Sequence, residues 1–114
     1  MIYSEVIMKT ITYNKLVRDR IPEIITSKGN TCITEVLSDE AYLKMLDAKL
    51  DEELTEYHAD GSPEELADLL EVIYAAAKAR GVSAEELDRI KAQKAAKRGG
   101  FDQKILLVSV TETN

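Results

Sequence analysis

The sequence predicts a mainly α-helical protein, built as an antiparallel helical bundle with small β segments near its termini. Three observations support this fold class. Apolar residues recur at helical spacing through the middle of the chain, helix-start residues precede these stretches, and glycines follow them. With 114 residues the chain is long enough for one core, so we expect residues 1–114 to form a single domain.

The N-terminal end is expected to be extended. Residues 2–13 alternate loosely and are rich in β-branched and aromatic types, which predicts a short strand or an N-terminal arm over 1–12. Met8 is a second candidate translation start, and residues 1–7 would then be an upstream extension.

A short helix is predicted from about Arg20 to Lys28. Asp19 is a suitable N-cap, Pro22 lies in the first turn, where its missing N–H costs little, and Gly29 follows the last turn. Two further strands are expected, at 31–37 and at 105–110, the second within a C-terminal strand and tail over 102–114. The strand at 31–37 is expected to pair with residues 2–8 or with 105–110, and these segments would form a small β appendage.

A long helix is predicted after Ser38 and runs to about Asp60. Its apolar residues recur at helical spacing at Leu43, Leu46, Leu50, Leu54 and Tyr57. At ~100° per residue, Glu53 and Glu56 fall inside the apolar arc and Glu52 falls outside it. A carboxylate on a core-facing stripe is costly unless its charge is compensated, so these acids are not interchangeable.

The next helix is predicted from Pro63 to about Arg80. Ser62 as N-cap, Pro63 at the first helical position and Glu65 at the third form a capping-box pattern, which gives Glu65 a purely structural alternative role. Apolar residues cover more than half of this helix, which predicts burial on two sides and a partner subunit as well as an intrachain core. Oligomerisation is therefore expected to complete the bundle.

A last helix is predicted after Ser83, which begins a second capping box, and ends near Arg98 before two glycines. Lys94 and Arg98 share one stripe of this helix with Lys91 and are candidate phosphate contacts. The alternative is that bases near the end of the helix only complement its dipole.

Two acidic patterns flank the turn between the two central helices, Glu53-x-x-Glu56 and Glu65-x-x-Asp68. Residues three apart are neighbours on a helix, and a hairpin folded at 60–63 brings the two pairs level. Carboxylates this close repel one another, so a divalent cation is the natural compensation. A di-iron bundle would need Glu-x-x-His motifs, which the single histidine, His58, does not form; all-oxygen ligation favours Mg²⁺, with Mn²⁺ as the alternative.

Basic residues are the candidate contacts for an anionic ligand. Lys15, Arg18 and Arg20 precede the first helix and suit either a solvated loop or a phosphate-binding arm. Lys49 lies one turn before Glu53, either as a surface pair or as a further phosphate contact.

The composition limits the classes of function. The net charge of -6 argues against sequence-independent binding of a nucleic-acid polymer, which needs lysine and arginine. The single cysteine excludes an intrachain disulfide and favours a reducing cytoplasm. No apolar run approaches a membrane span and no signal peptide is apparent, so we expect a soluble cytoplasmic protein that does not contact a membrane.

The ordered motifs resemble the all-α nucleoside triphosphate pyrophosphohydrolases. YNKLVRDRIPEII, KLDEELTEY, EELADLLEVIYA and RGGF together look like a small MazG-like subgroup, often labelled phosphoribosyl-ATP pyrophosphohydrolase-like, over 13–101. The resemblance implies an oligomeric hydrolase, a homodimer or homotetramer, that uses Mg²⁺ to split the α–β phosphoanhydride of a nucleotide into a monophosphate and pyrophosphate. It implies metal ligation by Glu53, Glu56, Glu65 and Asp68, and makes Glu52 a candidate for the base that activates water.

Alternatives to this activity remain open at the level of sequence. One is hydrolysis of phosphoribosyl-ATP in histidine biosynthesis, and another is a non-enzymatic helical protein that oligomerises or binds a partner. Clearing of noncanonical nucleotides is one role of the enzyme that the resemblance implies. Eight residues separate the two acidic motifs, where larger relatives carry an insertion, so the base-recognition pocket of those relatives cannot be mapped onto this sequence.

Overall fold

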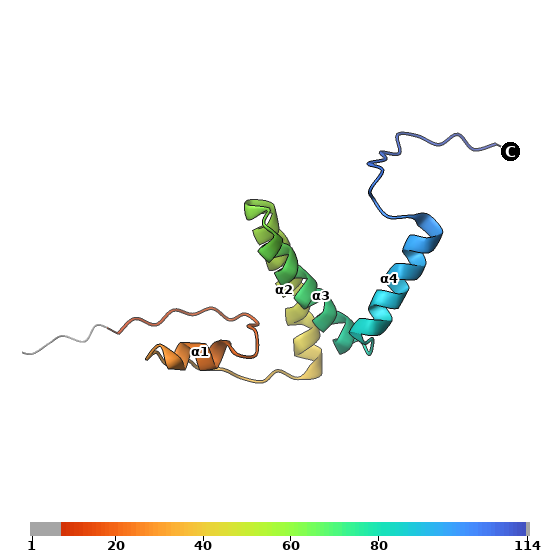
Figure 1. Ribbon diagram of the computed structural model, residues 1–114. Coiled ribbons are helices and arrows are strands. Elements are labelled where there is room, and N and C mark those ends of the chain that lie inside the picture. Colours follow the sequence, from red (N-terminus) through yellow and green to blue (C-terminus); the bar gives the residue numbers. More distant parts are fainter. Residues whose placement is uncertain (1–7, 114) are drawn as a thin grey trace, which may run out of the picture. The chain divides into compact units, whose positions relative to one another are not determined.

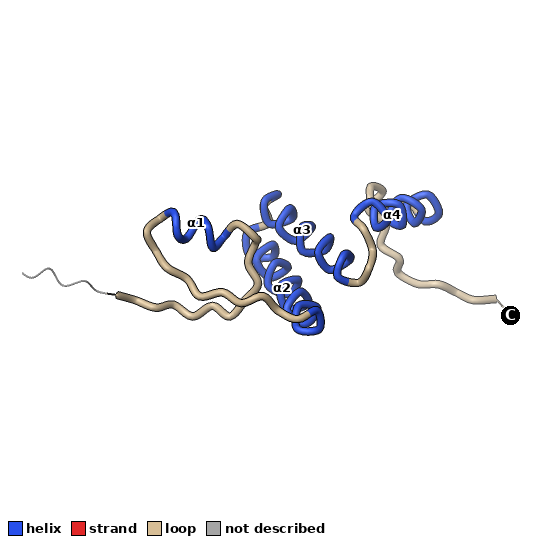
Figure 2. The backbone as a smooth tube through the Cα atoms, turned by 90° about the horizontal axis from the view of Figure 1, so that it is seen from below, coloured by secondary structure: helices blue, strands red, loops and turns tan. Residues whose placement is uncertain are grey.

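The computed structural model describes residues 8–113, and in this range the protein has four helices and no strand (Figures 1 and 2). The predicted mainly α-helical character is confirmed. The helices are α1 (Ile21–Ser27), α2 (Asp39–Asp60), α3 (Pro63–Ala79) and α4 (Ala84–Arg98).

Two of the predicted serine caps are present. The Ser38 hydroxyl accepts a hydrogen bond from the Ala41 N–H at 3.2 Å and starts α2, and the Ser83 hydroxyl accepts one from the Glu86 N–H at 3.1 Å and starts α4. Gly61 ends α2 in the left-handed region at a φ of 69°, with its N–H donated to the Tyr57 carbonyl. These local signals set both ends of α2 and the start of α4.

The start of α1 differs from the sequence prediction. Arg20, not Asp19, is the N-cap residue, and its side chain makes no capping hydrogen bond. Pro22 lies in the first turn as predicted, because its fixed φ suits a helix start.

The predicted β segments are wrong for the residues that the structure describes. No strand forms at 8–13, 31–37 or 105–110, and the part of the first prediction at 2–7 lies outside the described residues. Ile33 and Val36 are fully exposed, and Val108 is 86% exposed. β-branched composition reflects a local preference, but a strand is stable only when a neighbouring strand and a packed face are supplied, and these segments have neither.

The chain divides into two compact units, Met1–Ile73 and Tyr74–Asn114, with the boundary inside α3. In the first unit, α2 and the adjoining part of α3 form an antiparallel hairpin beside α1 (Figures 1 and 2). In the second unit, the Tyr74 hydroxyl donates a hydrogen bond to Asp88 of α4 at 2.8 Å.

The hydrophobic core of the hairpin is small. Leu46 of α2 is 3% exposed and is the only buried hydrophobic residue within 8–113. On α3, Leu66 and Leu70 are each 47% exposed and Ile73 is 37% exposed. The apolar surface of α3 is therefore only partly covered by its own chain.

No helix within residues 8–113 is both long enough and apolar enough to cross a membrane.

Candidate metal and phosphate site

Three of the four predicted acidic residues meet between α2 and α3. Glu53 of α2 and Glu65 and Asp68 of α3 each offer one carboxylate oxygen, and these three oxygens lie within 4.8 Å of one another. The hairpin produces this meeting because Glu53 and Asp68 are almost equally far from the turn at Gly61, on helices that run in opposite directions. We call these three residues the acidic cluster.

Glu56 does not join the acidic cluster. It is exposed, so the wheel prediction that it faces the interior is wrong. The buried surface of α2 is narrower than its apolar pattern predicts, since Leu54, one of the recurring apolar residues, is 43% exposed. The Glu56 charge still acts on the cluster, because it raises the pKa of both Glu53 and Glu65.

The cluster contains buried oxygen atoms without partners. Glu53 is only 6% exposed, and its Oε2 atom has no hydrogen-bond partner. Oε2 of Glu65 is likewise buried and unpartnered. Within the described residues Glu65 makes no hydrogen bond to the turn before α3, so the capping-box alternative for its side chain is not observed. Unpaired buried oxygens are costly, and a cation among them would remove that cost.

The pKa values of Glu53 and Glu65 also indicate that the acidic cluster lacks a compensating positive charge. Burial raises the pKa of the Glu53 carboxyl, and repulsion by Glu56 raises it further. Burial also raises the pKa of the Glu65 carboxyl, followed by repulsion from Glu56 and then Asp68. Both shifts mean that the folded protein disfavours the ionised carboxylates in the absence of a compensating positive charge.

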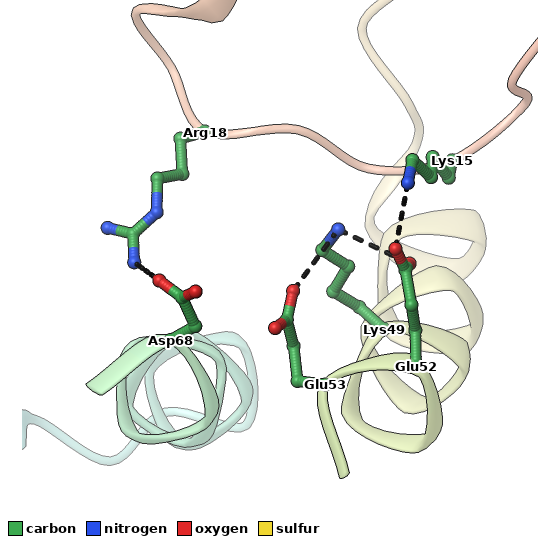
Figure 3. Close-up of polar contacts among 6 residues, drawn as sticks. All are labelled: Lys15, Arg18, Lys49, Glu52, Glu53 and Asp68. Carbon is green, nitrogen blue, oxygen red and sulfur yellow. Dashed lines mark hydrogen bonds and ion pairs between the residues drawn. The ribbon is translucent and has the colours of Figure 1, made fainter. Parts of the chain in front are cut away.

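A hollow of about 270 Å³ adjoins the acidic cluster and has basic as well as acidic walls. Glu53 and Asp68 line its acidic side, while Lys15, Arg18 and Lys49 line its basic side. Lys15 and Arg18 belong to the extended segment before α1, which passes over the α2–α3 hairpin (Figure 3). Lys15 and Arg18 therefore lie beside the acidic cluster, and both residues are exposed.

Each basic residue of the hollow is paired with an acid (Figure 3). Nη2 of Arg18 lies 2.6 Å from Oδ1 of Asp68. Nζ of Lys15 lies 2.8 Å from Oε1 of Glu52, and Nζ of Lys49 lies 3.3 Å from Oε2 of Glu52 and 3.4 Å from Oε1 of Glu53. The hydrogen bond from Lys15 lowers the pKa of the Glu52 carboxyl, and the same bond raises the pKa of the Lys15 ammonium.

The remaining predicted phosphate contacts lie elsewhere. Arg20 pairs with Glu23 at 3.1 Å, one turn along the chain, and is not among the residues that line the hollow. Lys94 is exposed on α4, in the other unit. Arg98 lines a separate hollow of about 230 Å³, together with the glycines that follow α4.

Glu71 is a residue of the hollow that the motif analysis did not select. It lies one turn after Asp68 on α3, so the same three-residue spacing that links Glu65 to Asp68 identifies it. No motif or spacing in the sequence identifies the apolar residues that line the hollow, which are Val17, Ile21 and Val72.

Comparison with known proteins gives one partial relative. Over 45 residues the chain is 56% identical to a protein of Mycolicibacterium smegmatis that is described as uncharacterized. The matched part is 40% of this chain and 46% of that relative, so the chain spans less than half of the relative's length. No family model matches the chain. No solved structure matches it either.

Proposed function

We propose that the protein is a Mg²⁺-dependent nucleotide pyrophosphohydrolase, which cleaves the α–β phosphoanhydride and releases a nucleoside monophosphate and pyrophosphate. One observation carries the proposal most directly. The acidic cluster, with two buried and unpartnered carboxylate oxygens, lies beside a hollow whose other side is lined by Lys15, Arg18 and Lys49. A polyphosphate bound together with a divalent cation needs both kinds of surface within a few ångströms.

The donor set suits a hard cation. Glu53, Glu65 and Asp68 supply only oxygen atoms, which Mg²⁺ prefers and which Mn²⁺ also accepts. These three residues would hold the ion, and Glu56 is close enough to contribute its charge. The bound cation would polarise a phosphate oxygen and stabilise the charge that develops as water attacks phosphorus.

The basic residues would bind and orient the phosphates. Lys15 and Lys49 both contact Glu52, so this carboxylate holds two ammonium groups at the edge of the hollow. Glu52 remains our candidate for the general base, but the lowered pKa of its carboxyl weakens it as a proton acceptor while Lys15 stays bound. A phosphate that draws Lys15 away would restore part of its basicity.

A pyrophosphate-release screen tests the activity. The full chain is assayed against canonical and modified nucleoside triphosphates and phosphoribosyl-ATP, with and without Mg²⁺. Turnover that is confined to phosphoribosyl-ATP would assign the histidine-pathway reaction instead. Absence of turnover on every substrate would favour the non-enzymatic alternative.

We also propose that the protein assembles as a homo-oligomer, a dimer or a tetramer. Hydrophobic residues make up 45% of the sequence, yet Leu46 is the single hydrophobic residue buried within 8–113. Leu66, Leu70 and Ile73 follow one another at helical spacing on α3 and are all more than a third exposed. A second copy of the same helix offers a complementary apolar stripe, and obligate oligomers often complete their cores in this way.

A further inference from the structure

Arg18 occupies a carboxylate that the proposed cation would also need. Its Nη2 atom lies 2.6 Å from Oδ1 of Asp68, and Asp68 is one of the three residues of the acidic cluster. The Arg18 side chain is 57% exposed and belongs to a segment without helix or strand, so a ligand in solution can reach its guanidinium group. Asp68 belongs to α3, and its carboxylate lies beside those of Glu53 and Glu65.

A divalent cation at the acidic cluster would compete with this ion pair. The cation would bind the Asp68 carboxylate that now attracts the Arg18 guanidinium. The positive charge of the cation would also repel the guanidinium. The nearest alternative for Arg18 is the hollow that it already lines with Lys15 and Lys49. A guanidinium presents a planar fork of donors that matches phosphate oxygens. A bound polyphosphate would therefore accept the hydrogen bonds that the Arg18 guanidinium no longer donates to Asp68.

We propose that Arg18 exchanges partners on cation binding: it neutralises Asp68 in the cation-free protein and is released by the cation to bind the phosphates of the substrate. This exchange rests on the proposed function of the same site and adds a coupling between its two ligands. The cation makes Arg18 available to the polyphosphate, so binding of each ligand favours binding of the other.

The exchange predicts effects of opposite sign from one substitution. In the full-length Arg18→Gln variant, loss of the competing guanidinium should tighten Mn²⁺ binding by about fivefold in the absence of any phosphate. At saturating Mn²⁺, the same variant should bind inorganic tripolyphosphate about tenfold more weakly. Isothermal titration calorimetry measures both affinities. Arg89→Gln is the matched control, since Arg89 is an exposed arginine of α4 outside both hollows, and it should change neither affinity.

The outcomes separate the exchange from the proposed function. Wild-type protein that binds no Mn²⁺ would refute the cation site itself and with it both proposals. Wild-type binding of Mn²⁺ with unchanged or weaker affinity in Arg18→Gln would overturn the exchange alone, even if tripolyphosphate binding falls. If Arg18→Gln does not fold, the Nε–Hε signal of Arg18 in wild-type protein decides, because titration with Mg²⁺ should shift it and a constant signal would contradict the exchange.

Discussion

Nζ of Lys49 lies 3.4 Å from Oε1 of Glu53, one helical turn away, while Oε2 of the same carboxylate is buried without a partner. Lys49 therefore neutralises only part of the negative charge of the Glu53 carboxylate. Burial and the repulsion by Glu56 outweigh the attraction to Lys49, so the pKa of the Glu53 carboxyl is raised. The cation-free protein carries an electrostatic cost at this position, and this cost can be measured.

Glu53→Gln should stabilise the cation-free protein at neutral pH. An acid with a raised pKa holds its proton more tightly in the folded state, so its contribution to the free energy of unfolding falls as the pH rises from the ordinary value near 4.5 through the folded value. The amide removes this cost, and the melting temperature at pH 7 should rise by a few degrees. Thermal denaturation between pH 4 and pH 8 measures this difference. The melting temperatures of wild type and variant should converge at the acid end of that range.

Glu52→Gln is the control for this prediction and should change the melting temperature at pH 7 in the opposite direction. The hydrogen bond from Lys15 lowers the pKa of the Glu52 carboxyl, so its ionised form contributes stability that is present above the unfolded pKa and is lost as the pH falls. The variant should be less stable than wild type at pH 7. Equal shifts in the same direction from both substitutions would contradict the assigned electrostatics.

Addition of Mg²⁺ should stabilise the wild-type protein. A ligand that binds the folded state alone raises the melting temperature with its concentration, and the buried unpartnered oxygens of Glu53 and Glu65 are what the cation would satisfy. Glu53→Gln should remove most of the increase. Differential scanning fluorimetry with Mg²⁺, Mn²⁺ and a monovalent salt at matched ionic strength measures it, and an equal increase with the monovalent salt would indicate screening in place of a cation site.

Helix periodicity predicts that Glu53, Glu65 and Asp68 lie close together, but it does not predict the contacts around them. Helix caps at Ser38 and Ser83 are local signals, and the positions of Glu53 and Asp68 follow from helix periodicity and one tight turn. Both are set by interactions over a few residues. The ion pair of Arg18 with Asp68 spans 50 residues and depends on the path of a segment without regular structure, which no periodicity encodes.

The wrong prediction of strands and the wrong prediction that Glu56 is buried have a common cause. Ile33 and Val108 lie in segments with the composition of strands, but no partner strand is supplied by the described chain. Glu56 lies on the apolar arc of α2, but the packing that would bury it is not made there. In each case the sequence shows which surface is apolar, whereas burial depends on what comes to cover that surface.

Lys15→Gln should weaken substrate binding with a smaller effect on turnover. Its ammonium group lines the hollow and would bind a phosphate in the ground state as well as in the transition state, so KM should rise by about tenfold. Lys44→Gln is the control, since Lys44 is an exposed lysine of α2 that pairs with Glu40 at 3.8 Å and does not line the hollow. Steady-state kinetics on the preferred substrate test the prediction, and an unchanged KM in Lys15→Gln would remove Lys15 from the binding site.

Leu70→Glu should dissociate the oligomer. Leu70 is 47% exposed at the middle of the apolar stripe of α3, and a charge there would be buried without a partner in the assembled protein. Ile24→Glu is the matched control, because Ile24 of α1 is 41% exposed and lies outside the stripe. Light scattering after size-exclusion chromatography measures the mass, and a wild-type protein that elutes as a monomer would contradict the proposed assembly.

The most direct test of the central claim is product analysis with wild-type protein and Glu65→Gln. Glu65→Gln removes one charge from the acidic cluster, and the fold should persist because its carboxylate makes no hydrogen bond to the turn within the described residues. Wild type should release pyrophosphate and a nucleoside monophosphate only with Mg²⁺ or Mn²⁺, and Glu65→Gln should be slower by more than about a hundredfold. Glu64→Gln, at the exposed neighbouring position, should retain activity. Full activity of Glu65→Gln, or release of orthophosphate in place of pyrophosphate, would contradict the account.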